Sequence, residues 1–186
     1  MSNGSLDAAT MHCLSIRHWK SSPVAGCLCG TRMKVIREVP LLVSFCLAGV
    51  PCRCNGKAKT NPQIVEAVVS GAASAACPEV LGDLPTPSPP AGILEGSGND
   101  LLEGNAKVVA INGEDLTQAF ISRAQKVADL AAESGITEAI LQDRSLSFGC
   151  GAIYDGSHSG TLMEGDGVLA ALLKRRGLFV STCRGQ

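Results

Sequence analysis

Apolar and polar positions alternate between two periods along the chain, which predicts strands separated by helices. Val39–Phe45 is a continuous apolar run, as expected for a strand that is buried on both faces. Pro62–Ser70 has the spacing of a helix that begins with proline, and Ala72–Ala76 follows it as a second short strand. Residues 82–92 contain four prolines and therefore predict no regular structure.

The same alternation continues through the second half. Lys107–Ile111 predicts an edge strand or a lead-in to the next helix. Asp115 is placed to cap a long helix that ends at Gly135. The apolar stripe of this helix consists of Leu116, Phe120, Ala124, Val127 and Ala131. The elements that follow are a strand at Ala139–Leu141, a helix capped by Asp166 and ending at Lys174–Gly177, and a final strand at Leu178–Val180.

Strands that alternate with helices predict right-handed crossovers and a mainly parallel sheet. The fold class is therefore α/β: a three-layer α/β/α arrangement around a Rossmann-like sheet. The chain has 186 residues, which suits a single domain, predicted here over 33–186. Residues 1–32 show no sustained period. They predict a disordered extension ahead of Met33, which we interpret as a natural start.

Composition narrows the possible partners and compartment. The net charge is −1 and no basic stripe occurs, so neither nucleic acid nor an anionic membrane is expected as a partner. The longest apolar runs are too short or too broken to span a membrane. The nine cysteines are odd in number and unevenly spaced, which fits a reducing cytoplasm better than a secreted disulfide framework.

Three cysteines follow three separate predicted strands. Cys46 ends the first apolar run, Cys77 ends the second, and Cys150 lies in the loop after Ala139–Leu141. The carboxyl ends of parallel strands lie along one edge of a sheet, so these thiols are placed to meet there. Three thiolates suit a soft metal, either zinc or an iron–sulfur cluster, and the alternative is that they are small buried apolar residues.

Five stretches carry a resemblance to a known family. They are VSFCLAGVPCRCNG at 43–56, CPEVLGDLPTPSPPAGI at 77–93, NGEDLTQAF at 112–120, RSLSFGCGAIYDGSHSGTL at 144–162 and GDGVLAALLKRRGL at 165–178. In this order they resemble the thiouracil desulfurase (thiouracil desulfidase) family, small bacterial proteins long known as a domain of unknown function. The resemblance implies a [4Fe-4S] cluster on three cysteines. It also implies a small-molecule substrate, a thiolated nucleobase such as thiouracil, whose sulfur water replaces to give the oxo base and sulfide.

Matched residue by residue, the resemblance places two cluster ligands on Cys46 and Cys77. The family pattern for the third ligand is S-P-S-C-G, and this chain has Phe148 at its cysteine position. Cys150 comes two residues later and is either a displaced third ligand or a neighbour that never contacts iron. Elsewhere Cys54, Ser88 and Gly92 replace an aromatic residue, an arginine and a glutamate of the family pattern.

The resemblance also suggests residues for catalysis and substrate binding. Glu79 is the candidate proton carrier, with helix capping as its alternative, and Ser145 is the candidate that positions water or the base. Ser147, Asn55 and Gly56 are candidates for lining the substrate pocket, although such residues also shape turns.

Three functional hypotheses follow. The first is an iron–sulfur-dependent desulfurase with its metal ligands at Cys46, Cys77 and Cys150. The second is a non-catalytic family member, acting as a small-molecule or zinc-binding module, because Phe148 has abolished the cluster. The third is a zinc site in which Cys52 or Cys54 provides the fourth ligand.

Overall fold

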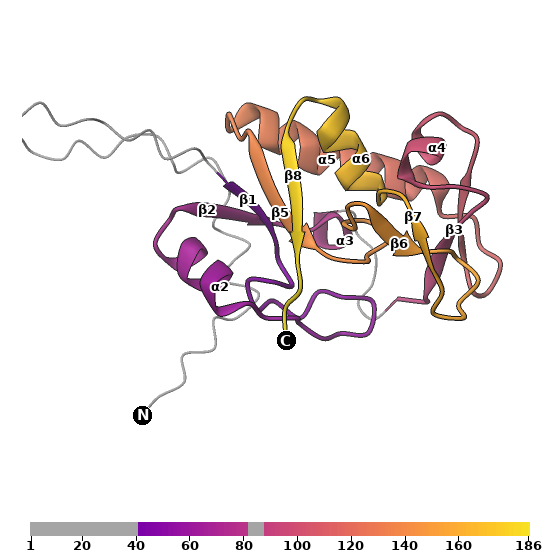
Figure 1. Ribbon diagram of the computed structural model, residues 1–186, viewed down its shortest axis with the longest axis horizontal. Coiled ribbons are helices and arrows are strands. Elements are labelled where there is room, and N and C mark those ends of the chain that lie inside the picture. The colour runs from indigo at the N-terminus through magenta and orange to yellow at the C-terminus, as the bar shows by residue number, and fades with distance from the viewer. Residues whose placement is uncertain (1–40, 82–87) are drawn as a thin grey trace, which may run out of the picture. The chain divides into compact units, whose positions relative to one another are not determined.

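Four parallel strands form the central sheet in the order β2-β1-β5-β8 (Figure 1). The computed structural model describes residues 41–81 and 88–186. The strands are β1 (Leu41–Ser44), β2 (Ala73–Ala76), β5 (Glu138–Gln142) and β8 (Phe179–Cys183). In the ladder, Val43 of β1 lies between Ala75 of β2 and Ile140 of β5. All carboxyl ends therefore lie at one edge, as the alternating pattern predicts.

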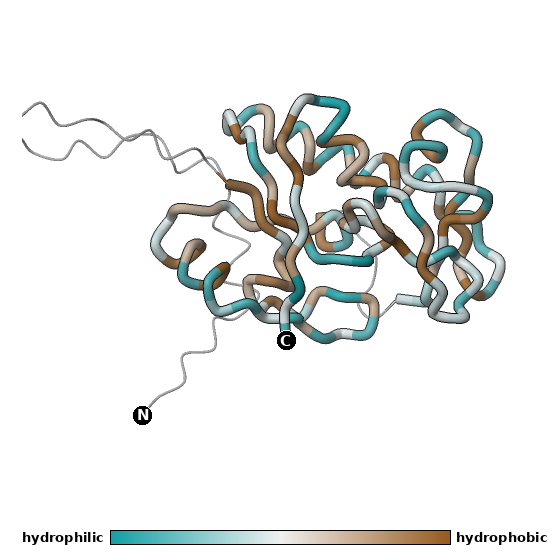
Figure 2. Tube along the Cα trace, viewed as in Figure 1, coloured by the Kyte–Doolittle hydropathy of each residue, from teal (hydrophilic) through white to brown (hydrophobic). Residues whose placement is uncertain are grey.

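Helices cover both faces of this sheet. On one face, α2 (Pro62–Val69) packs through Ile64 against Val43 and Ala73. On the other, α5 (Thr117–Glu133) and α6 (Val168–Arg175) enclose the larger core, which includes Leu42 and Ala139. Successive strand residues point to opposite faces, which is why Leu42 and Val43 belong to different clusters. Figure 2 shows hydrophobic residues along the strands, and the three-layer α/β/α prediction is confirmed.

The helix ends differ in detail from the sequence predictions. Asn61 caps α2 by accepting hydrogen bonds from the next turn, with Pro62 at the first helical position. Asp115 accepts from the Thr117 N–H (2.9 Å), yet the residue at the N-cap of α5 is Leu116. At α6 the N-cap is Gly167.

Asp166 therefore serves another purpose than the helix cap predicted for it. Its carboxylate accepts from the Gly151 N–H at 2.9 Å and contacts the Lys174 ammonium at 2.8 Å. These contacts tie the loop after β5 to the last turn of α6.

Several short elements between the main ones were not predicted. One is the strand β3 (Ala91–Leu94), which pairs antiparallel in a separate small sheet with β4 (Lys107–Ala110), the edge strand predicted at Lys107–Ile111. The prediction that residues 82–92 lack regular structure is thus wrong for Ala91 and Gly92, and 82–87 lie outside the described residues. The others are α3 (Pro78–Leu81), α4 (Gly98–Leu102) and the antiparallel pair β6 (Ala152–Tyr154) and β7 (Leu162–Glu164).

The described residues form one compact unit within Val39–Gln186. The predicted disordered extension, residues 1–32, and the start at Met33 lie outside the described residues. Within residues 41–81 and 88–186, no helix is long and apolar enough to cross a membrane.

Candidate metal and substrate site

Two predicted cysteines lie at adjacent strand ends. Cys46 follows β1 and Cys77 follows β2, and their side chains are 1% and 0% exposed. The Phe45 N–H donates to the Ala76 carbonyl at 3.1 Å, which holds the two strand ends together. Because β1 and β2 are neighbours in the sheet, both cysteines reach the same part of its carboxyl edge.

A third buried thiol, Cys52, belongs to the same core cluster as Cys46 and Cys77 and is 4% exposed. Interaction with Cys46, then with Cys77, and then burial raise the pKa of the Cys52 thiol. The pKa of Cys46 is lowered, chiefly by the hydrogen bond from Cys52.

The carboxyl group of Glu79 joins this cluster. The Cys77 thiol donates to Glu79 Oε2 at 3.3 Å. Burial raises the pKa of Glu79, while the Cys77 hydrogen bond and the charges of Arg123 and Arg53 oppose that shift. A carboxyl group with a raised pKa beside a cavity suits proton transfer near neutral pH.

The loop after β5 presents Phe148, and not Cys150, to this region. Phe148 is 3% exposed and lines a cavity together with Cys46 and Glu79. Cys150 donates instead to the Val180 carbonyl at 3.6 Å and contacts Lys174 of α6.

The sheet register shows how far Cys150 lies from the other thiols. Val180 pairs with Ala139, which in turn pairs with Leu42 of β1. The carbonyl that Cys150 contacts is thus two strands from β1, roughly 10 Å across the sheet, and level with a residue well before Cys46. The predicted meeting of three strand-end thiols is therefore observed for Cys46 and Cys77 but not for Cys150.

The remaining candidates divide between the cavity and surface turns. Ser145 lines the cavity, and its hydroxyl oxygen accepts from the Ser147 N–H at 3.2 Å. Ser147 is buried beside it but does not line the cavity. Asn55 and Gly56 lie in an exposed turn, where Asn55 Oδ1 accepts from the Lys57 N–H at 3.1 Å. Of the four, the structure brings only Ser145 to the cavity wall.

The cavity has a volume of about 220 Å³, and its lining includes four basic side chains together with the carboxyl groups of Glu79 and Asp143. Ligand pockets for drug-sized molecules have about 300–1,000 Å³, so this one suits a smaller ligand. The basic side chains that line it are Arg53, Lys59, Arg144 and Arg184. Sequence reasoning missed this basic lining because its members come from three separate segments.

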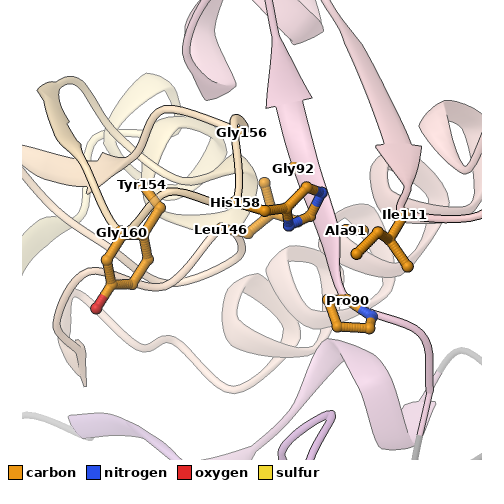
Figure 3. A pocket seen from close by; sticks show the side chains of 9 residues that line it. All are labelled: Pro90, Ala91, Gly92, Ile111, Leu146, Tyr154, Gly156, His158 and Gly160. Atoms are coloured by element: carbon orange, nitrogen blue, oxygen red, sulfur yellow. The ribbon is translucent and has the colours of Figure 1, made fainter.

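A second cavity of about 460 Å³ adjoins the first and shares Ala91, Leu146 and Tyr154 with it. Figure 3 shows the Tyr154, His158 and Ile111 side chains around it. It carries none of the predicted ligands or catalytic residues. The thiols and Glu79 therefore assign the chemistry to the smaller cavity.

The donor chemistry fits a soft metal in part. Cys46 and Cys77 suit an iron–sulfur cluster, whereas the Cys150 of the predicted set does not join them. Among residues 41–81 and 88–186, no group of three or more His, Cys, Asp or Glu side chains is arranged to hold a single metal ion. A cluster differs from a single ion, because its cysteine ligands bind different iron atoms. Fold and site together define an α/β protein with a thiol-rich site at the carboxyl edge of a parallel sheet.

Comparisons with known proteins give the family. The model of the 2-thiouracil desulfurase family matches residues 41–183. YbbK of Bacillus subtilis, described as uncharacterized, is 44% identical over 140 residues, which cover 75% of this chain and 93% of YbbK. The structure of the [4Fe-4S]-dependent thiouracil desulfidase TudS matches with a TM-score of 0.67 and 36% identity, over 77% of this chain and 89% of that one. This chain belongs to the 2-thiouracil desulfurase family.

Proposed function

We propose that this chain is a desulfidase that converts a thiolated nucleobase such as 2-thiouracil into the oxo base. In the balanced reaction, water adds its oxygen to the thiocarbonyl carbon and the sulfur leaves as hydrogen sulfide. The observation that carries the proposal is the grouping of Cys46, Cys77 and Glu79 beside a small cavity. Membership of the family and the likeness to TudS support it.

The metal part of the proposal concerns Cys46 and Cys77. These two residues would hold a [4Fe-4S] cluster. When bound, the cluster supplies a Lewis-acidic iron with affinity for sulfur. Free thiols of this kind persist in a reducing compartment, so we place the enzyme in the cytoplasm.

The protein groups around the cavity supply binding and proton transfer. Arg144 and Arg184 pair with Asp143, and the two remaining basic side chains, Arg53 and Lys59, favour a base that carries partial negative charge on its sulfur and oxygen atoms. Glu79 holds the proton that the leaving sulfur or the incoming water must exchange. The Ser145 hydroxyl orients the water or the base, and Phe148 contributes an apolar wall that limits entry of other water.

Sulfide release tests this proposal. Anaerobically purified chain, loaded with iron and sulfide and freed of excess reagent, is incubated with 2-thiouracil, and both sulfide and uracil are measured. We expect equal amounts of the two products. The Cys46→Ala variant serves as the control, and it should release neither. Loaded protein that forms no uracil would refute the proposed activity.

The second candidate is a non-catalytic binding module, favoured by the Phe148 ring at the position where the family pattern has a cysteine. In this case the chain binds thiouracil or zinc without turnover. Calorimetric titration with 2-thiouracil, together with metal analysis, separates the two functions. Binding without iron and without sulfide release supports the module.

A further inference from the structure

We infer that Cys52 is the third cysteine ligand at the strand-edge site of this chain, together with Cys46 and Cys77. It replaces the ligand that the family pattern takes from the loop after β5. The inference rests on the proposed function for the identity of the bound group, an iron–sulfur cluster.

The loop after β1 folds back to bring Cys52 to the other two thiols. The Val50 N–H donates to the Phe45 carbonyl at 3.0 Å, and the Lys59 N–H donates to the Cys46 carbonyl at 3.0 Å. These bonds close the loop at both ends. Cys52 is thereby buried in the same core cluster as Cys46 and Cys77.

The loop after β5 provides no cysteine ligand to the site. Phe148 fills the wall beside Cys46, and an aromatic ring cannot bind iron. Cys150 points to the Val180 carbonyl and to Lys174, at the far side of two strands. Of the six cysteines in the described residues, Cys52 is therefore the one besides Cys46 and Cys77 that is buried.

Binding of a cluster would change the protonation of the three thiols. Cysteine ligands of a cluster are thiolates, so Cys46, Cys52 and Cys77 would each give up the thiol proton when they hold it. Three cysteine ligands leave one iron of a cubane without a protein ligand. Of the three proposed ligands, Cys46 lines the cavity, whereas Cys52 and Cys77 are absent from its lining.

Serine variants distinguish the three cysteines that compete for this role. Cys52→Ser, Cys150→Ser and Cys54→Ser are each reconstituted anaerobically with iron and sulfide, and iron per chain and visible absorption are measured. Cys54 is the matched control because it lies in the same loop as Cys52 but is exposed. We expect Cys52→Ser to lose more than about half of its iron, since one ligand in three is gone. The other two variants should retain it.

Two further experiments distinguish the loss of a ligand from misfolding of the variant. In the double variant Cys52→Ser with Phe148→Cys, the loop after β5 regains a thiol, and we expect iron binding to return. In the unsubstituted chain, iodoacetamide labelling followed by mass spectrometry should show Cys46, Cys52 and Cys77 protected on loading. The labelling rates of Cys54 and Cys150 should be unchanged.

Each outcome decides the question. Loss of iron in Cys150→Ser but not in Cys52→Ser would overturn the inference, as would protection of Cys150 in place of Cys52. An unsubstituted chain that takes up no iron while the single variant Phe148→Cys does would also overturn it. A chain that needs Cys52 for iron but releases no sulfide from 2-thiouracil would uphold the inference and refute the proposed function.

Discussion

At the scale of single residues, the sequence predicts the place of a side chain well where a strand fixes it. Cys46 and Cys77 directly follow buried strands, so the register of a parallel sheet determines that they are neighbours. Cys150 lies eight residues beyond the end of β5, in a loop whose direction depends on tertiary contacts. The place of Cys52 could not be predicted for the same reason, since only the return of its loop brings it to the site.

Replacement of Glu79 by glutamine tests proton transfer. Glutamine keeps the size of the side chain but cannot carry the proton, so we expect sulfide release to fall by about 10²- to 10⁴-fold. Iron per chain should stay unchanged, because the change leaves all thiols in place. The measurement is the rate of sulfide release at saturating 2-thiouracil. A rate within about twofold of the unsubstituted chain would show that Glu79 has a structural role.

At the scale of elements, periodicity identified the long helices and the four strands of the main sheet. It missed β3, which directly follows a proline-rich stretch, and β6 and β7, whose three residues each are too few to show a period. It also assigned Asp166 to a helix cap, a local role, although the side chain pairs with Lys174 eight residues away. Long-range pairing of this kind leaves no local signal in the sequence.

The contact between Asp166, the Gly151 amide and Lys174 predicts a stability effect. Asp166→Asn removes the charge that both partners use, so we expect a loss of about 1–2 kcal/mol in the free energy of unfolding. The matched control is Glu103→Gln, which breaks the exposed ion pair to Arg175 and should cost less than about 1 kcal/mol. Urea denaturation measures both. Equal losses of unfolding free energy in the two variants would show that the Asp166 contacts stabilise the fold no more than the exposed ion pair does.

A departure from the family pattern also has an explanation at this scale. The pattern has a glutamate where this chain has Gly92 in β3, and a Cβ atom there would collide with the backbone of Gly156. We therefore expect Gly92→Ala to lower the free energy of unfolding by about 1–3 kcal/mol. Thermal unfolding followed by circular dichroism checks this. An unchanged Tm would mean that the loop around Gly156 moves aside at little cost.

At the scale of the whole molecule, the architecture explains why the site is where it is. The parallel strands place their carboxyl ends at one edge, and the thiols that follow β1 and β2 are buried in the core cluster that includes α5 and α6. The fold class and this edge could be predicted from the sequence, because both follow from the order of strands and helices. The side chain that completes the site could not, since one loop turns toward the edge and another turns away.

The metal content of the anaerobically purified chain tests the central claim, that these strand ends hold an inorganic centre, most directly. Before any reconstitution, iron, zinc and acid-labile sulfide are measured together with visible absorption. We expect a brown protein with about four iron atoms and as many labile sulfides per chain. The Cys46→Ala and Cys77→Ala variants should lose both the iron and the sulfide. Colourless protein without iron, or zinc in its place, would contradict it.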